Sequence, residues 1–151
     1  MKNIVLYDSI YGNTQQIATT IADNLPNSKL IYIDQINLND LKNIDLLVVG
    51  SPTLGGRPTQ KLQNFFNQIP QNALKDIKLA VFDTGFFESA QNFALRLLIK
   101  TIGYAAPKMA SFLETKGAKL ITSPETFIVT GKSGPLATGE LDRAKLWAKE
   151  F

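Results

Sequence analysis

Short apolar runs of strand length alternate with helical patterns along the whole chain, and this alternation limits the fold more than any other feature. The runs are nearly continuous in Val, Ile and Leu, which is typical of strands covered on both faces. They occupy residues 4–7, 30–33, 46–49 and 79–82, with a last pair at 120–122 and 127–129. Successive strand–helix units build a parallel sheet with right-handed crossovers. The chain is therefore predicted to form a doubly wound, five-stranded parallel sheet in three α/β/α layers.

The helical patterns fall between these strands, at residues 14–24, 59–67, 91–102, 108–116 and 140–149, with a short one around 38–42. Pro26 follows the first helix and Gly117 ends the fourth, as is common at helix C-termini. The stretch 91–102 is an extra helix, which either packs on the sheet or covers a ligand or a partner surface. No linker, repeat or low-complexity tract divides the chain, so residues 1–151 are expected to form one domain.

The composition excludes several kinds of chemistry. The 151 residues contain no cysteine and no histidine, so a thiolate nucleophile, a zinc–sulfur site and proton transfer by histidine are all excluded. With 44% hydrophobic residues the chain can bury a core without disulfides. The net charge is +3, but no run of Lys or Arg with interleaved aromatic residues indicates nucleic acid. We expect no metal site.

The sequence also lacks membrane and export signals. No stretch approaches the ~18 apolar residues that a membrane span needs. The first apolar run is short and ends at Asp8, unlike a signal peptide. We therefore expect a soluble cytoplasmic protein. We also expect a monomer rather than an oligomer.

The loop after the first strand combines a glycine with hydroxyl and amide side chains. It reads Ser9-Ile10-Tyr11-Gly12-Asn13-Thr14. The free N–H groups of such a loop and of the following helical turn point at one spot, where the helix dipole also favours negative charge. Gly12 would let the backbone approach a ligand closely. The loop predicts a phosphate site; the alternative is an ordinary turn with Asn13 as N-cap and Gln16 reaching back to it.

Two further loops are expected to open beside the first. After the third strand, small and turn-forming residues make a second loop, Gly50-Ser51-Pro52-Thr53-Leu54-Gly55-Gly56-Arg57-Pro58-Thr59. After the fourth strand comes a third loop, Asp83-Thr84-Gly85-Phe86-Phe87. In a doubly wound sheet of order 2-1-3-4-5, ligands bind where the winding reverses, between strands one and three. The loops therefore predict one crevice, in which Phe86 and Phe87 either stack on a flat ring or plug the core.

These loops resemble those of the flavodoxin family. Tyr-Gly-Asn-Thr at 11–14 is similar to its phosphate loop, and Gly-Ser-Pro-Thr at 50–53, followed by Gly-Gly and Pro-Thr, is similar to its second flavin loop. Asp83 stands where its third loop begins, and the order of strands and helices fits over essentially the whole chain. Flavodoxin is itself the standard example of FMN bound beside strands one and three.

The resemblance implies FMN as the cofactor and electron transfer between redox partner proteins, with the flavin carrying the redox chemistry. It places the phosphate at residues 9–14, and the isoalloxazine ring between residues 53–56 and residues 84–87. No catalytic residue is implied. The predicted cofactor-binding residues are Ser9, Ile10, Tyr11, Gly12, Asn13, Thr14, Pro52, Thr53, Leu54, Gly55, Gly56, Asp83, Thr84, Gly85, Phe86 and Phe87.

Two departures from the family pattern bear on the partner more than on the cofactor. Carrier flavodoxins are usually strongly acidic, whereas this chain is basic, and their second loop often stacks an aromatic residue where Leu54 stands. Two alternatives stay open: an FMN-dependent oxidoreductase that reduces a quinone-like acceptor, and a flavin-free protein-interaction module. The near-intact phosphate loop disfavours the module. The absence of His and Cys disfavours the enzyme, so we favour a small electron carrier.

Two remaining features are interpreted as structural. Gly131-Lys132-Ser133 looks like part of a nucleotide-binding P-loop, but the earlier glycine would fall on Thr126, so we interpret it as a surface turn. Trp147 lies in the last helix and is expected to belong to the core.

Overall fold

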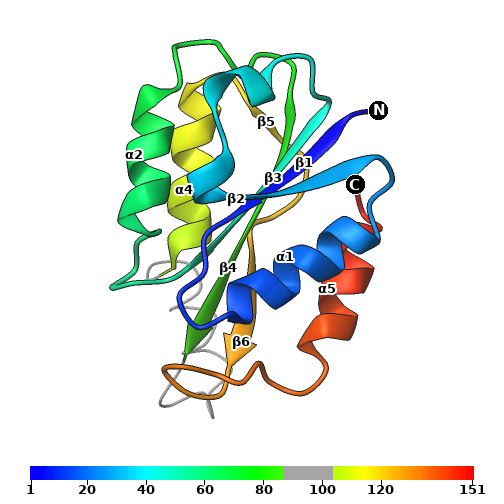
Figure 1. The fold of residues 1–151 in the computed structure, drawn as a ribbon, viewed down its shortest axis with the longest axis vertical. Coiled ribbons are helices and arrows are strands. Elements are labelled where there is room, and N and C mark those ends of the chain that lie inside the picture. The colour runs from blue at the N-terminus through cyan, green and yellow to red at the C-terminus, as the bar shows by residue number, and fades with distance from the viewer. Residues whose placement is uncertain (87–103) are drawn as a thin grey trace.

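A parallel β-sheet forms the centre of the protein, seen in a computed structural model that describes residues 1–86 and 104–151 (Figure 1). Its order is β2-β1-β3-β4-β5, and a further strand, β6, also pairs with β4. The predicted order is therefore confirmed, with the fifth position shared between β5 and β6, which pair with successive parts of β4. The strands are β1 (Asn3–Tyr7), β2 (Ser28–Tyr32), β3 (Leu46–Pro52), β4 (Lys78–Phe86), β5 (Lys119–Leu120) and β6 (Glu125–Val129).

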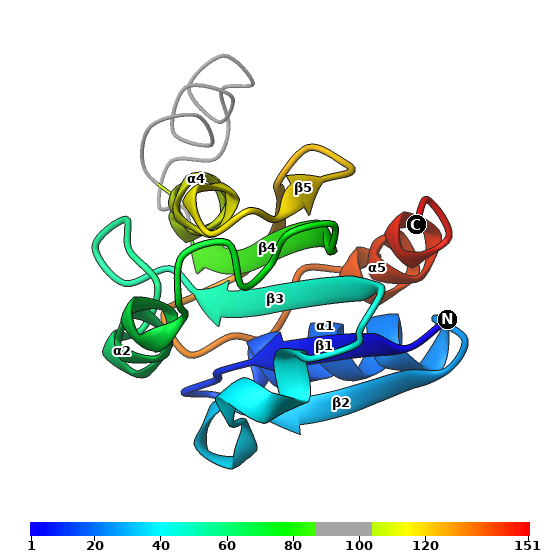
Figure 2. The same ribbon diagram turned by 90° about the horizontal axis from the view of Figure 1, so that it is seen from above.

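Helices cover both faces of this sheet, so the predicted three layers are present (Figures 1 and 2). One face carries α2 (Gln60–Gln68) and α4 (Ala105–Thr115), and the other carries α1 (Asn13–Asp23) and α5 (Glu140–Ala148). Two short 3-10 turns, η1 (Ile33–Gln35) and η2 (Leu38–Leu41), follow β2. No described helix has the length and apolar character needed to cross a membrane. The helix predicted at 91–102 lies outside the described residues.

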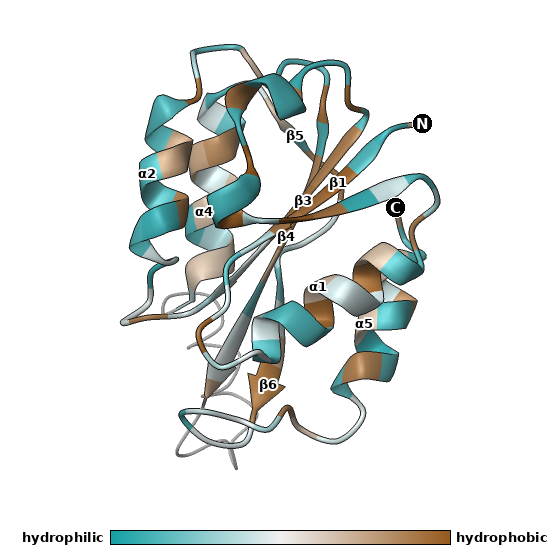
Figure 3. Ribbon diagram, viewed as in Figure 1, coloured by the Kyte–Doolittle hydropathy of each residue, from teal (hydrophilic) through white to brown (hydrophobic). Residues whose placement is uncertain are grey.

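Two apolar clusters, one on each face of the sheet, form the core. In β3, Leu47 and Val49 face the cluster under α2 and α4, whereas Leu46 and Val48 face the cluster under α1 and α5. This alternation explains why the central strands are apolar at every position, and Figure 3 shows them as the most hydrophobic part of the fold. Trp147 joins the second cluster, so its predicted place in the core is confirmed.

The main error in the predicted elements concerns β4. The sequence predicts a loop at residues 83–86, but the structure continues the strand through Phe86. Their backbones pair with β3 at Ser51 and Pro52, and with β6 up to Val129. Because partners on both sides satisfy its hydrogen bonds, the strand extends four residues beyond the apolar run that predicted it.

Smaller differences occur at other element ends. The second strand begins at Ser28 rather than at residue 30, and Ile33 already belongs to η1. Helix α4 begins at Ala105 rather than at residue 108, with Pro107 in its first turn, where no backbone donor is needed. The short helix expected around 38–42 is the 3-10 turn η2.

One glycine of β3 is required by close packing at the centre of the second cluster. A Cβ atom on Gly50 would lie 2.0 Å from Phe82 Cζ. The Phe82 ring is fully buried and packs edge-on against Phe127 and Trp147, at centroid distances of 5.8 and 6.1 Å. The ring therefore has no free space into which it could move.

We expect Gly50→Ala to lower the free energy of unfolding by at least ~2 kcal/mol, because it overpacks this site. Urea denaturation of the purified variant measures the loss. Adding Phe82→Leu to Gly50→Ala should recover part of it, since the shorter side chain leaves room for the new methyl group. A Gly50→Ala variant as stable as the wild type would show that the glycine is not required.

Candidate functional site

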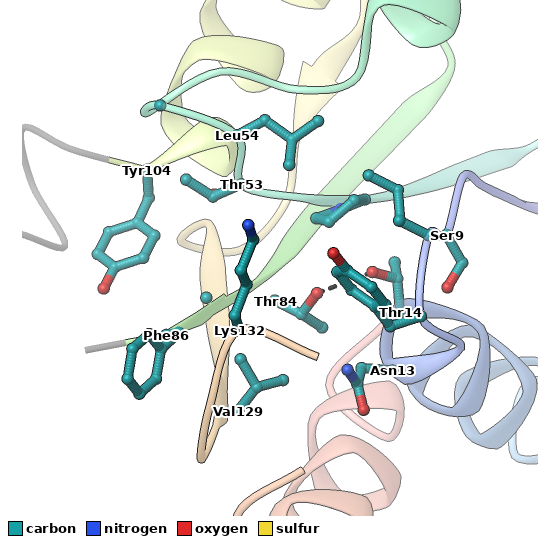
Figure 4. A pocket seen from close by; sticks show the side chains of 15 residues that line it. Ser9, Asn13, Thr14, Thr53, Leu54, Thr84, Phe86, Tyr104, Val129 and Lys132 are labelled. Atoms are coloured by element: carbon teal, nitrogen blue, oxygen red, sulfur yellow. Dashed lines mark hydrogen bonds between the residues drawn. The ribbon is translucent and has the colours of Figure 1, made fainter. Parts of the chain in front are cut away.

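A crevice of about 420 Å³ opens at the carboxyl ends of β1, β3 and β4 (Figure 4). Its volume lies within the range of roughly 300–1,000 Å³ usual for cofactor sites. Most of the residues predicted to bind the cofactor line it together. They are Ser9, Ile10, Tyr11, Asn13, Thr14, Pro52, Thr53, Leu54, Gly55, Thr84, Gly85 and Phe86.

Three other predicted residues, Gly12, Gly56 and Asp83, are described by the structure but do not line the crevice. Gly12 and Gly56 shape the turns beside it, and Asp83 is fully buried next to it. Phe87 lies outside the described residues. Three lining residues were not predicted, and they come from later segments: Tyr104, Val129 and Lys132.

The first loop turns into α1 through a glycine in the left-handed conformation. Gly12 is the N-cap residue and has φ +89°. A Cβ atom there would meet nothing within 4 Å, so the backbone angle, not crowding, favours glycine. The alternative in which Asn13 is the N-cap is wrong. Asn13 is the first helical residue, and its Nδ2 donates a hydrogen bond to the carbonyl oxygen of Ser133 at 3.2 Å.

This turn leaves several backbone donors free. The Oγ of Ser9 accepts hydrogen bonds from the amides of Gly12, at 3.1 Å, and Gln15, at 3.4 Å. Within the described chain, no protein group accepts from the remaining amides of the turn, which are those of Ile10, Tyr11, Asn13 and Thr14. They stand at the positive end of the α1 dipole, which suits an anion.

The second loop is a tight two-glycine turn. The backbones of Leu54 and Arg57 exchange two hydrogen bonds, of 2.8 and 3.1 Å, across Gly55 and Gly56. Both glycines have positive φ, +56° and +77°. Positive φ at both central positions is the requirement of a type I′ turn, and it explains the adjacent glycines. The turn holds Leu54 at the mouth of the crevice, where its side chain is exposed.

Hydrogen bonds tie the three crevice-lining segments to one another. The hydroxyls of Thr14 and Thr84 lie 2.7 Å apart and are both buried, which joins the start of α1 to β4. The amide of Thr53 donates to the carbonyl oxygen of Thr84 at 2.9 Å, which joins the second loop to the same strand. Thr84 is therefore the point to which the first and second loops are both attached.

A buried carboxylate connects the second loop to α4. Asp83 Oδ2 accepts from Thr53 Oγ1 at 3.0 Å and from the amide of Ala106 at 2.8 Å. Thr53 Oγ1 in turn accepts from the amide of Ala105 at 3.0 Å. Burial raises the pKa of Asp83 to about 6, although these hydrogen bonds act in the opposite direction. Asp83 was predicted to bind the cofactor, but the structure gives its side chain a part in holding the helix and the loop together.

Residues 131–133 form an exposed turn, as interpreted from the sequence, but Lys132 also lines the crevice. The turn follows β6 and is closed by a hydrogen bond of 2.8 Å from the Thr130 amide to the Pro135 carbonyl. The bond from Asn13 to Ser133 fixes it beside the start of α1. Its lysine extends into the crevice (Figure 4), and it is the one charged side chain in the described part of the lining.

Exposed apolar side chains gather around the crevice. Ile10 and Tyr11 of the first loop are 52% and 53% exposed, Leu54 of the second is 45% exposed, and Phe86 at the end of β4 is 42% exposed. All of them line the crevice. The site therefore joins an anion-binding turn to an apolar rim, which fits an amphiphilic ligand with a charged end and a flat body. Within residues 1–86 and 104–151, no group of three or more acidic side chains could hold a metal ion.

Comparisons with known proteins agree with this geometry. The family model described as "Flavodoxin domain" matches residues 4–128. The chain is 30% identical over 131 residues to "Probable flavodoxin 1" of Bacillus subtilis (strain 168), a match that covers 83% of this chain and 80% of that protein. Among solved structures, oxidised Flavodoxin 1 from Bacillus cereus has a TM-score of 0.76 at 20% identity, covering 99% and 96% of the two chains. An archaeal flavodoxin has a TM-score of 0.75 at 19% identity, covering 98% and 94%.

The chain therefore belongs to the flavodoxin family. It is an FMN-binding electron-transfer protein, as the resemblance of its loops predicted. The sequence alone left two alternatives open, a flavin-free module and a quinone-reducing enzyme. Both are less well supported than an FMN-binding electron carrier.

The raised pKa of Asp83 generates a test of the buried network. In the unfolded chain the carboxyl has its ordinary pKa of 3.8, whereas in the folded protein it is about 6. Well below pH 3.8 the carboxyl is protonated in both states, so its ionisation does not affect the free energy of unfolding. Above pH 6 both are ionised, and the folded state alone bears the cost of a buried charge. Ionisation of Asp83 therefore removes stability as the pH rises from about 4 to about 6.

We expect the stability of the wild type relative to Asp83→Asn to fall across this range, by up to about 3 kcal/mol. Urea denaturation of both apoproteins between pH 4 and pH 7 measures the difference. A difference that stays constant over this range would show that Asp83 ionises normally in the folded protein.

Proposed function

We propose that the crevice binds FMN with its phosphate on the first loop and its isoalloxazine ring between the second loop and the end of β4. The observation that carries this proposal is the set of unpartnered amides around Gly12 at the start of α1. FMN supplies one- or two-electron chemistry when bound, and the protein supplies position and electrostatics. The protein carries these electrons between redox partner proteins.

The chemistry of the first loop fits a phosphate. The free amides and the helix dipole offer charge-assisted hydrogen bonds to a dianion. Among the described lining residues no Asp or Glu side chain opposes a negative group, and Lys132 adds a positive charge. Gly12, with its open space, leaves the approach to these amides clear.

The other side of the crevice fits a flat aromatic ring. Leu54 on the second loop and Phe86 on β4 expose apolar surface to it, and Tyr11 adds an aromatic side chain. At Gly85 a Cβ atom would lie 2.4 Å from the Tyr104 ring, so the glycine lets this ring lie directly over the strand. Glycine at 85 and the tyrosine at 104 therefore build one wall of the crevice together.

A carrier fits this site better than an enzyme. The described part of the lining contains no Asp, Glu, His or Cys side chain, so it lacks the groups that most often move protons in catalysis. We propose that the chain acts as a single domain, as a monomer, in the cytoplasm.

Spectroscopy of the apoprotein tests the proposal. Titration with FMN should yield a perturbed flavin spectrum and a higher melting temperature, since a ligand at 100-fold its dissociation constant stabilises the fold by ~2.7 kcal/mol. Reduction of the bound FMN should then need a separate reductase. Direct turnover of NAD(P)H with a quinone would identify the enzyme instead, and a melting temperature indifferent to FMN would contradict the binding site.

Removal of the Thr14 hydroxyl tests the junction between the first loop and β4. We expect Thr14→Ala to weaken FMN binding by roughly 1–3 kcal/mol, because the change removes a polar group beside the phosphate and its bond to Thr84. Thr14→Ser keeps the hydroxyl and should bind FMN nearly as well as the wild type. Fluorescence titration of the three apoproteins measures the affinities, and equal affinities would exclude Thr14 from the site.

Neutralisation of Lys132 tests whether its charge acts on the phosphate. We expect Lys132→Gln to weaken FMN binding three- to tenfold, which is about 0.7–1.4 kcal/mol, with a larger effect at low salt. Riboflavin, which lacks the phosphate, should bind the variant and the wild type equally. If the affinity for riboflavin falls as much as that for FMN, the lysine acts on the ring and not on the phosphate.

A further inference from the structure

A second hollow, the α2/α4 groove, lies beside the crevice between helices α2 and α4. It measures about 230 Å³ and is lined by Arg57, Pro58, Gln63, Phe66, Asn67, Lys108, Met109 and Phe112. Figures 1 and 2 both show the two helices side by side on the same face of the sheet. Phe66 and Phe112 stack at the groove with ring centroids 6.2 Å apart, so its floor is largely apolar and aromatic.

The groove and the crevice share the second loop. Leu54 and Gly55 of this loop line the crevice, and Arg57, at the end of the same turn, lines the groove. Lys108 Nζ donates to the carbonyl oxygen of Gly56 at 2.6 Å, which holds the loop against α4. A molecule bound in the groove would therefore be separated from the flavin site only by the Leu54–Arg57 turn.

The rim of this groove is positively charged. Arg57 and Lys108 line it and are exposed, and Lys116 Nζ lies 5.5 Å from the centre of the Phe112 ring. None of the described groove-lining residues is acidic. The described residues place no carboxylate within ion-pair distance of these three cations, whereas Lys61 on α2 is paired with Asp34 at 2.8 Å.

Lys132 adds a further cation on the far side of the crevice. Asp83, which immediately precedes the crevice-lining residues of β4, is fully buried and cannot face a partner. The flavin site is therefore bordered on two sides by cations that have no carboxylate partner among the residues that the structure describes. Unpaired charges of one sign around an apolar centre favour a partner of the opposite sign, because they steer its approach and fix its register.

We propose that the α2/α4 groove and the adjoining second loop form the docking face for a redox partner protein with an acidic surface around an exposed apolar side chain. This inference rests on the proposed function, since it assigns the chemistry of the partner that exchanges electrons at the crevice. The groove is smaller than the roughly 300–1,000 Å³ of small-molecule sites, so it suits a side chain of a protein. Its aromatic, Met and Arg lining is the composition enriched at protein interfaces. A second copy of this chain would bring like charges together.

Two electron acceptors of opposite charge can probe this face. Plastocyanin carries an acidic patch and accepts one electron at Cu(II), and a lysine-rich c-type cytochrome accepts one electron at haem Fe(III). In each reaction, one electron leaves the reduced FMN of the loaded protein and reduces the acceptor metal by one unit. Stopped-flow mixing gives the two rates as a function of ionic strength. We expect salt to slow the reaction with plastocyanin and to accelerate the reaction with the cytochrome.

Charge reversal locates the effect on the surface. At low ionic strength, Arg57→Glu should slow the reaction with plastocyanin by roughly three- to tenfold and speed the reaction with the cytochrome. Lys75→Glu makes the same change of charge in the exposed loop before β4, at the opposite edge of the sheet, and should change both rates less than twofold. The Arg57 side chain takes no part in the turn, whose bonds are made by the backbone, so the variant should fold. Arg57→Gln and Lys75→Gln form a second pair of variants, in which the charge at each position is neutralised rather than reversed.

The outcomes separate this inference from the proposed function. If the wild type binds FMN but Arg57→Glu and Lys75→Glu alter the rates equally, only net charge matters and the docking face is wrong. If the wild type does not bind FMN, the proposed function itself fails.

Amide chemical shifts of the FMN-loaded protein provide a direct map of the contact. Titration with redox-inert, zinc-substituted plastocyanin should shift the amides of Arg57, Asn67, Met109 and Phe112. Shifts confined to α1 and α5, on the other face of the sheet, would overturn the assignment.

Discussion

Unpartnered backbone donors at the start of α1 are the feature on which the rest of the site depends. They are left free because Gly12, at φ +89°, starts α1 after the loop that follows β1 and supplies no side-chain cap. The neighbouring segments are then attached to this turn. Thr14 meets Thr84 of β4 at 2.7 Å, and Asn13 holds the Lys132 turn through Ser133. The sheet supplies a rigid base because β1, β3 and β4 are buried on both faces.

The sequence predicted most of the fold because its apolar runs coincide with the strands buried between two helical layers. For the same reason it predicted most of the crevice. In a parallel sheet, the loops after strands one, three and four open at one edge, so Ser9, Thr53 and Thr84 come together although they are far apart in the chain. The glycine pair at 55 and 56 indicated a tight turn, and both glycines have the positive φ that such a turn requires.

The rest of the site depends on pairings that local patterns do not contain. Residues 83–86 resemble a loop because Asp83 and Thr84 are polar and Gly85 follows them, yet pairing with β3 and β6 keeps them in a strand. Asp83 is predicted to be a cofactor-binding residue, but its carboxylate is buried and accepts a hydrogen bond from the Ala106 amide at the start of α4. The sequence does not predict Lys132 as a site residue, because its Gly-Lys-Ser pattern matches only part of a P-loop. Its position after β6, at the edge where the crevice opens, was the available signal.

The central claim, that the amides around Gly12 hold the FMN phosphate as a dianion, is tested most directly by ³¹P NMR of the FMN-loaded protein between pH 5 and pH 8. A free phosphate monoester takes up a proton with a pKa near 6, so its resonance moves across this range. Charge-assisted hydrogen bonds to the dianion lower that pKa. The account predicts a bound resonance that stays fixed from pH 5 to pH 8. A bound resonance that titrates like that of free FMN would contradict it.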